Sequence, residues 1–185
     1  MVALEQDEIK RRAVDLYLLL FDVDGVMTDG GIILIGESAE AKRFDVQDGM
    51  GVTLARAAGL KVGIITGRAS APVHRRAEEL RMDEVCQGYF YKEEALDVLI
   101  EKHAIDPRRI AYVGDDLLDL PVMKRVGLPI AVSNACPEVK AHSIYVTQAR
   151  GGHGAVREVI DWLLDLRGQK EAVYSLFAES RERRS

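Results

Sequence analysis

The sequence is poor in cysteine, tryptophan and proline, and it carries no excess of basic residues. Its 185 residues include two cysteines, Cys86 and Cys136, one tryptophan and five prolines. The two cysteines lack the spacing of a metal site, and we expect reduced thiols rather than a disulfide. The formal net charge is -5, whereas a chain that binds nucleic acid usually carries a basic excess. We therefore expect neither a disulfide scaffold nor a nucleic-acid partner.

Long apolar runs are also absent. No run approaches the roughly 18 apolar residues of a membrane span. Residues 1–12 are polar and mixed in charge, unlike a signal peptide. The four histidines are scattered, and no pair of them has the spacing of zinc ligands. Hydrophobic residues make up 48% of the chain, which suits one domain with a full core. We expect a soluble, cytoplasmic protein without a membrane partner.

Short apolar runs alternate with helical patterns along most of the chain. Strands are expected over residues 16–21, 61–65, 84–87, 109–113, 129–132 and 144–146. Helices are expected over residues 4–13, 48–58 (with Asp48 as the N-cap), 70–80, 92–103, 119–127 and 155–166. This alternation predicts an α/β fold, a Rossmann-like parallel sheet flanked by helices.

An expected β-hairpin, with strands over 32–35 and 41–46 around a turn at 36–40, stands where a crossover helix would be expected. Such an apolar hairpin usually packs on something, often another subunit. We expect one domain over residues 1–167 and a C-terminal tail over 168–185. The tail has a short helix around 172–177 and basic residues at 181–184.

Two carboxylates follow the first expected strand. Asp22 and Asp24 come directly after the apolar run, and Gly25 permits a turn there. In open α/β sheets, ligands bind outside the carboxyl ends of the strands, so both acids should lie at the mouth of a cleft. Like charges this close favour a bound cation or a shared proton. The alternative is a strand that ends in a solvated acidic loop.

Further acids follow the strand at 109–113. Asp115 and Asp116, with Asp22 and Asp24, would place four carboxylates in one pocket, which is costly without a counter-charge. A hard divalent cation bound by oxygens resolves this, and magnesium is the usual choice beside a phosphate. The alternative is a helix start decorated with acids, which the helix dipole favours and which applies most to Asp119.

Two other positions indicate an anion site. Thr66 ends a strand and is followed by a glycine and a helix start, where backbone N–H groups can bind an anion. Lys92 opens a helix, where the dipole disfavours a cation, and this suggests a separate task such as holding a phosphate. A surface ion pair is the alternative for Lys92. His153, in a glycine-rich loop, could also reach the cleft.

At this point the residues resemble a known family, the haloacid dehalogenase-like phosphatases. Residues 22–30 resemble its first motif, Thr66 the second, Lys92 the third and residues 114–119 the fourth, in that order. Segments 44–49, 65–68 and 151–158 are similar to the capless branch, whose type member is 3-deoxy-D-manno-octulosonate 8-phosphate phosphatase. The resemblance implies a sugar-acid phosphate as substrate and a homotetramer in which the hairpins form a central barrel.

The resemblance also implies roles for the acids and for two other groups. Asp22 would be the nucleophile that forms an aspartyl-phosphate, and Asp24 the general acid and then the general base. Mg²⁺ would be held by the Asp22 carboxylate, the Asp24 backbone carbonyl and the Asp115 carboxylate. Thr66 and Lys92 would grip the phosphoryl oxygens.

Other residues would support these or contact the sugar. Asp116 and Asp119 would be supporting acids, with Asp119 orienting Lys92. The substrate-binding residues would be Asp24, Asp45, Asp48, Gly49, Arg68, Arg76 and Lys92, with the two arginines on the substrate carboxylate.

Other functions remain open from the sequence. The same chemistry could act on a nine-carbon sugar-acid phosphate or on another small phosphate ester. A receiver-like signalling domain also uses a strand-end Asp, magnesium, Thr and Lys, but its acceptor lacks a second Asp two residues later, so Asp24 favours turnover. A catalytically idle assembly module is the third alternative, although all four motif positions are filled.

Overall fold

A computed structural model describes residues 5–37 and 39–179, and its centre is a parallel sheet of six strands in the order β5-β4-β1-β6-β7-β8. The strands are β1 Leu18–Phe21, β4 Lys61–Thr66, β5 Glu84–Gln87, β6 Ile110–Gly114, β7 Leu128–Ala131 and β8 Tyr145–Val146. Strand β1 pairs with β4 on one side and with β6 on the other. All four of its residues are fully buried, as expected for a central strand of a parallel sheet. The predicted α/β fold is confirmed.

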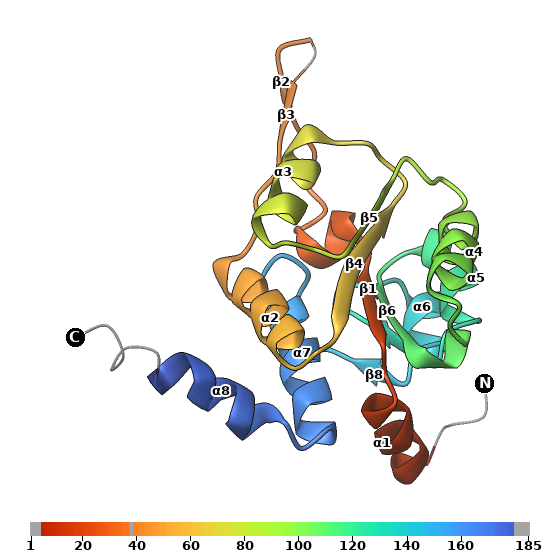
Figure 1. The fold of residues 1–185 in the computed structure, drawn as a ribbon. Helices are drawn as coiled ribbons and strands as arrows, with labels where there is room; N and C mark the ends of the chain where they lie inside the picture. Colours follow the sequence, from red (N-terminus) through yellow and green to blue (C-terminus); the bar gives the residue numbers. More distant parts are fainter. Residues whose placement is uncertain (1–4, 38, 180–185) are drawn as a thin grey trace.

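Helices cover both faces of the sheet (Figure 1). They are α1 Gln6–Val14, α2 Val46–Ala57, α3 Ala71–Glu79, α4 Lys92–His103, α5 Leu120–Met123, α6 Pro137–Ala141, α7 Ala155–Leu166 and α8 Lys170–Ala178. Helices α2, α3 and α7 lie on one side, and α4, α5 and α6 on the other (Figure 1). The chain thus winds outward from β1 twice, and the strand ends that carry the acids share one edge of the sheet.

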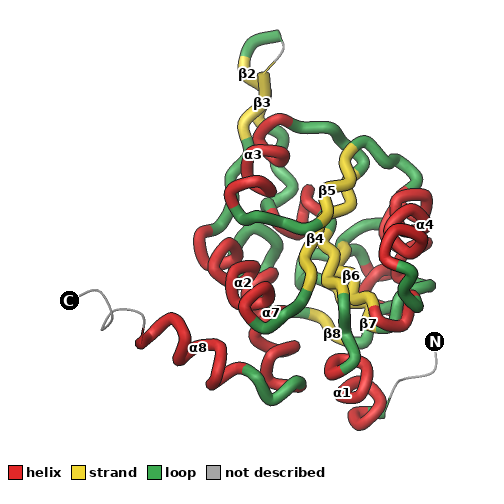
Figure 2. The backbone as a smooth tube through the Cα atoms, viewed as in Figure 1, coloured by secondary structure: helices red, strands yellow, loops and turns green. Residues whose placement is uncertain are grey.

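A two-stranded hairpin, β2 Ile33–Ile35 and β3 Ala39–Ala41, projects away from the sheet (Figure 2). The strands pair antiparallel, with Leu34 opposite Glu40. Three successive apolar side chains of β2 are exposed, by 51% at Ile33, 73% at Leu34 and 55% at Ile35. The hairpin is therefore present as predicted, and its apolar strand is uncovered in the single chain. Ser38, in the expected turn, lies outside the described residues.

The second hairpin strand and the next helix start differ from the prediction. Strand β3 covers only Ala39–Ala41, so the strand expected over 41–46 is wrong. Asp45 is the N-cap of α2, and its side chain accepts a hydrogen bond from the Gln47 N–H, so the assignment of Asp48 as the cap is also wrong. Both errors have one cause: two acids three residues apart offer equally good caps, and the choice decides where the helix begins.

Several other boundaries differ as well. The first strand begins at Leu18, the helix expected over 119–127 is a short 3₁₀ turn, Leu117–Asp119, followed by α5, and α6 was not predicted. The first helix was expected from residue 4, which lies outside the described residues, as does the arginine-rich segment 181–184.

The tail forms helix α8, which packs on α2 and α7. Val173 is buried, and the Tyr174 hydroxyl donates to Asp161 at 2.7 Å. The division of the chain at residue 167 stays a prediction.

Candidate active site

The chain turns sharply after β1, and this turn presents Asp22 and Asp24. Residues Val23–Met27 form a tight π-helical turn in which Asp24 and Gly25 have non-helical dihedral angles. Gly25 has φ = 100°, a conformation that favours glycine. A Cβ atom on Gly25 would also clash with a carboxylate oxygen of Asp115. The backbone thus favours glycine here, and a side chain would also require the Asp115 carboxylate to move.

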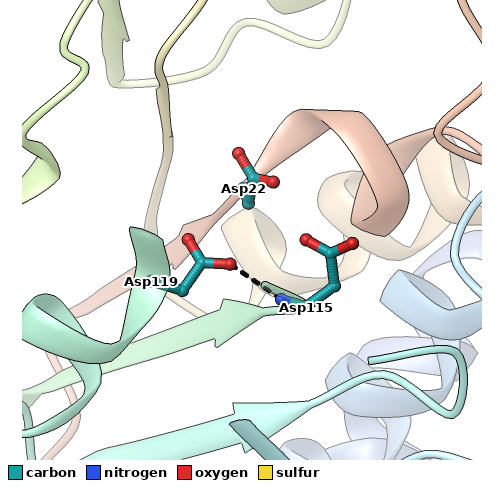
Figure 3. Close-up of side chains that lie close together, drawn as sticks. All are labelled: Asp22, Asp115 and Asp119. Carbon is teal, nitrogen blue, oxygen red and sulfur yellow. Dashed lines mark hydrogen bonds between the residues drawn. The ribbon is translucent and has the colours of Figure 1, made fainter. Parts of the chain in front are cut away.

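Three carboxylates from two strand ends lie together (Figure 3). Asp22, Asp115 and Asp119 each offer an oxygen, and these oxygens lie within 4.8 Å of one another. Burial raises the pKa of Asp22 to about 6, and the Lys92 ammonium opposes this rise. Burial, followed by the charges of Asp22 and Asp119, raises the pKa of Asp115 to about 8. The cluster therefore holds more negative charge than its own lysine neutralises, and it fits a hard, oxygen-bound cation such as Mg²⁺.

Asp119 uses both of its oxygens within the protein. One oxygen accepts hydrogen bonds from the Lys92 ammonium and the Tyr112 hydroxyl, each at 2.6 Å. The other accepts from the Asp115 N–H at 2.8 Å, which ties it to the loop that carries Asp115. Asp119 is 1% exposed, and it fixes its neighbours instead of offering free oxygens. Asp22 and Asp115 are the members with oxygens to spare for a cation.

Lys92 is the first residue of α4, and it points into the same cluster. It is 4% exposed, and its ammonium lies 2.7 Å from Asp22 and 2.6 Å from Asp119. Burial alone would lower the pKa of Lys92, but the two carboxylates outweigh burial and raise it. The lysine is therefore a permanent cation beside Asp22, and the surface-pair alternative is excluded by its burial.

Thr66 and Asp116 lie at the ends of β4 and β6, the two strands that flank β1. Thr66 ends β4, is 2% exposed, and its hydroxyl lies 3.5 Å from the Arg68 N–H. Asp116 accepts from the Leu117 N–H and forms a reciprocal capping box with Asp119. The structure thus places Thr66 at the sheet edge that carries Asp22, and Asp116 in a local capping role.

Asp24 faces a different set of groups from Asp22. Its carboxylate forms an ion pair with Lys42, and its other oxygen lies 3.9 Å from Arg68. Arg68 also bonds Glu40 at 2.9 Å. The structure therefore brings Asp24 and Arg68 together, and it adds Glu40 from the hairpin and Lys42 from its base. A substrate contact by Asp24 or Arg68 stays a prediction.

Arg76 and two of the residues expected on the sugar side lie beside one another. An Arg76 N–H group donates to the Asp45 carbonyl at 3.3 Å, and another donates to Glu79 at 3.0 Å. A Cβ on Gly49 would clash with the Arg76 guanidinium, so a larger residue would require that side chain to shift. Next to them is a cavity of about 420 Å³, lined by Lys42, Phe44, Ala71, Pro72, Arg75, Arg76 and Glu79.

Asp48 and His153 make other contacts. Asp48 is 2% exposed and accepts from the Arg157 N–H at 2.9 Å, at the start of α7. A direct substrate contact by Asp48 stays a prediction. The exposed His153 lies 2.9 Å from an Arg43 nitrogen, and Arg43 pairs with Asp29.

Three residues that surround the predicted site were missed. Lys42 contacts Asp24, and Tyr112 contacts Asp119. Asn134 donates to the Gly25 carbonyl at 2.9 Å and accepts from Gly151. Of these three residues, only Tyr112 could have been identified from the sequence, because a tyrosine inside an apolar strand needs a hydrogen-bond partner for its hydroxyl.

Known proteins are similar to this chain in sequence and in fold. Residues 84–160 match the family described as haloacid dehalogenase-like hydrolase. The 3-deoxy-D-manno-octulosonate 8-phosphate phosphatase KdsC of Escherichia coli (strain B / BL21-DE3) is 44% identical over 162 residues, which cover 88% of this chain and 86% of that protein. The chain belongs to this phosphatase family. The family enzyme from Salmonella typhi is likewise 44% identical, over 161 residues that cover 87% of this chain and 86% of that protein.

Two solved structures of the family have the same fold. The phosphatase from Moraxella catarrhalis, in complex with a magnesium ion, a phosphate ion and KDO, has a TM-score of 0.89 and 41% identity, and the match covers 94% of this chain and 99% of that one. The phosphatase from Yersinia pestis has a TM-score of 0.86 and 41% identity, with 89% of each chain covered. The capless α/β fold of this family is thus the fold of the chain described above.

Proposed function

We propose that this chain is a Mg²⁺-dependent phosphomonoester hydrolase that converts 3-deoxy-D-manno-octulosonate 8-phosphate to the free sugar acid and phosphate, a step in making a lipopolysaccharide precursor. The observation that carries the proposal is the membership of the phosphatase family together with the buried Asp22 and Lys92 and the partly buried Asp115 at one sheet edge. Fold alone would not suffice, because one fold hosts many functions.

The reaction begins at Asp22. A carboxylate oxygen of Asp22 attacks the phosphorus, and the bond between phosphorus and the sugar oxygen breaks. Asp24 donates a proton to the leaving sugar oxygen. In the second step a water attacks the aspartyl-phosphate, Asp24 takes the proton of that water, and phosphate leaves with Asp22 restored as a carboxylate.

The other residues bind and orient the substrate. Lys92 neutralises charge on the phosphoryl oxygens, and the Thr66 hydroxyl lies at the same sheet edge to donate to them. Arg68 and Arg76 bind the substrate carboxylate, because the guanidinium fork matches carboxylate geometry.

The remaining residues hold this framework. Asp45 and Gly49 shape the sugar side beside Arg76, and Asp48 fixes that segment against α7. Asp119 orients Lys92, and Asp116 caps the loop that carries Asp115.

Mg²⁺ would be held by the Asp22 and Asp115 carboxylates and the Asp24 backbone carbonyl, where it would neutralise charge on the phosphoryl group. The pKa of Asp115, raised to about 8, supports this, because burial and the neighbouring carboxylates oppose its charge and a bound divalent cation would offset them.

The proposal is tested by phosphate release from a panel of sugar-acid phosphates, with Mg²⁺ and with EDTA. We expect Mg²⁺-dependent release that is fastest from the eight-carbon sugar acid. Faster phosphate release from a nine-carbon sugar-acid phosphate, or from an unrelated ester, would overturn the assignment of the substrate. A stable phospho-Asp22 with no release would indicate a receiver-like domain instead.

We also propose that the protein forms a homotetramer in the cytoplasm, without a nucleic-acid or membrane partner. The exposed apolar strand Ile33–Ile35 supports the oligomer, because such a strand edge invites pairing. Across the described residues, no helix is long and apolar enough to cross a membrane. Sedimentation of the wild type and of Leu34→Glu tests the assembly: we expect a tetramer that the variant breaks, and a monomeric wild type would contradict it.

A further inference from the structure

Lys42 has a buried charged side chain to which the reaction as described gives no task. Its side chain is 1% exposed, and its ammonium forms an ion pair with Asp24. A lysine is almost never fully buried unless it is paired, and the loss of one partner from a buried pair is costly. The position of Lys42 therefore depends on Asp24, and the position of the Asp24 carboxylate depends on Lys42.

The two residues come from different parts of the fold. Asp24 lies in the tight turn after β1, whereas Lys42 follows β3 directly, at the base of the hairpin. Glu40, two residues before Lys42, bonds Arg68 at 2.9 Å, and Arg68 lies 3.9 Å from the second oxygen of Asp24. The result is an alternating row of charges, Lys42, Asp24, Arg68 and Glu40, in which Glu40 belongs to the returning hairpin strand and Lys42 follows that strand directly.

This row decides how the Asp24 carboxylate is oriented. The terminal torsion of an aspartate is broad, so a free carboxylate would sample many orientations. Here one oxygen is held by the ammonium of Lys42, and the guanidinium of Arg68 lies beside the other. A proton donor must lie within hydrogen-bond reach of the leaving oxygen, and a displacement of about 1 Å can cost about a hundredfold in rate.

We propose that Lys42 is a positioning residue for the proton-transfer step, since it holds the Asp24 carboxylate toward the leaving oxygen, and that the base of the hairpin is thereby part of the active site. The inference rests on the proposed role of Asp24 in phosphate-ester hydrolysis. Lys42 also lines the cavity of about 420 Å³ beside Arg76, so its stem borders the space on the sugar side.

Two substrates with different leaving groups separate positioning from simple structural support. The alkoxide of a sugar phosphate needs a proton to leave, whereas p-nitrophenolate does not. Because kcat/KM reports the steps up to the first bond cleavage, only the sugar-acid phosphate should depend on the proton from Asp24. In Lys42→Met we expect kcat/KM to fall at least about thirtyfold for 3-deoxy-D-manno-octulosonate 8-phosphate and less than about threefold for p-nitrophenyl phosphate.

Lys42→Gln is the second variant, since it keeps a polar group in the buried site if Lys42→Met fails to fold, and thermal melting monitors both. Lys61→Met is the matched control: Lys61 pairs with Asp83 at 3.5 Å at the start of β4, the opposite edge of the sheet, and both substrates should be unaffected. Equal losses for the two substrates, or no loss, would overturn the inference. A wild type that releases no phosphate from the sugar-acid phosphate would instead overturn the proposed function.

Discussion

The ammonium of Lys92 lies 2.7 Å from a carboxylate oxygen of Asp22. The same ammonium lies 2.6 Å from Asp119, so one buried cation serves two buried carboxylates. The ion pair with Lys92 holds Asp22 at the end of β1. Burial outweighs the opposing effect of the Lys92 charge, so the pKa of Asp22 rises to about 6. The arrangement is suited to a nucleophile that shares its site with a metal ion and a phosphoryl group.

The first prediction removes the proposed nucleophile, Asp22. Asp22→Asn should lower phosphate release by about a thousandfold or more, because no aspartyl-phosphate can form. The fold should survive, since Asn has the same shape and Lys92 keeps Asp119 as its partner. Phosphate release and thermal melting measure the two effects. Asp165→Asn, at an exposed position on α7, is the control that should keep both. Full turnover by Asp22→Asn would refute the assignment.

The second prediction removes the buried ammonium group of Lys92. Lys92→Met leaves Asp22 and Asp119 buried without their counter-charge, and we expect a loss of about 3–5 kcal/mol in the free energy of unfolding. Added Mg²⁺ should restore part of this loss, because it supplies positive charge at Asp22 and Asp115. Urea unfolding with and without Mg²⁺ tests both statements.

Lys102→Met is the matched control for that experiment. Lys102 lies at the other end of α4, pairs with Glu84 at 2.8 Å and has a 56% exposed side chain. Its removal should cost much less than the removal of Lys92, because the ion pair of an exposed lysine is screened by solvent, and the cost should not respond to Mg²⁺. Similar losses for the two lysines would show that burial beside Asp22 does not set the cost.

The strands and the residues at their ends could be predicted because their signals are local. The run Leu18–Phe21 is apolar throughout, as a central parallel strand requires, and its end at Asp22 is visible in the sequence. Since parallel strands share one edge, Asp115 and Lys92 could be placed near Asp22 without knowing the strand order. The convergence of Asp22, Asp115 and Lys92 follows from topology more than from any single contact.

The residues that orient the acids could not be predicted, because their partners are far along the chain or depend on a small choice of boundary. Asn134 contacts Gly25 across 109 residues. Lys42 reaches Asp24 only because β3 ends at Ala41, and the sequence favoured a strand that continued to residue 46. A strand of that length would have given Lys42 a position on a projecting hairpin instead of against the turn after β1.

The third prediction concerns the two hydrogen bonds of Asn134 that hold the turn after β1, which we call the Asn134 clamp. Asn134 joins the Gly25 carbonyl to the Gly151 N–H, and the neighbouring Gly152 N–H donates to Val26 at 3.0 Å. Asn134→Ala leaves two polar groups without these bonds, at a cost of about 1–3 kcal/mol. Because the turn carries Asp22 and Asp24, we expect kcat to fall about tenfold with little change in KM.

Steady-state kinetics and urea unfolding of the variant check this. Ser143→Ala is the control, since the Ser143 hydroxyl makes a similar bond, to the Lys140 carbonyl at 2.8 Å, away from the acids. It should lose a comparable free energy of unfolding without losing kcat. An Asn134→Ala enzyme that is less stable but has unchanged kcat would show that the clamp does not act on the catalytic turn.

The fourth prediction concerns Asp48 and pH. Burial raises the pKa of Asp48 from 3.8 to about 6, although the N–H groups at the start of α7 oppose the rise. The folded protein therefore binds this proton more tightly than the unfolded chain does. The resulting stabilisation is fully present below pH 3.8 and is lost as the pH rises through about 6.

Asp48→Asn removes that dependence while keeping an oxygen that can accept from Arg157. Relative to the wild type, the variant should gain up to about 3 kcal/mol in the free energy of unfolding between pH 4 and pH 8. Urea unfolding of both proteins at each pH cancels the titration of all other groups. Asp97→Asn should show the opposite trend, because a hydrogen bond from Arg125 lowers the pKa of Asp97, so its carboxylate stabilises the fold at higher pH. A difference between Asp48→Asn and the wild type that does not change with pH would mean that the carboxylate of Asp48 is not desolvated against α7.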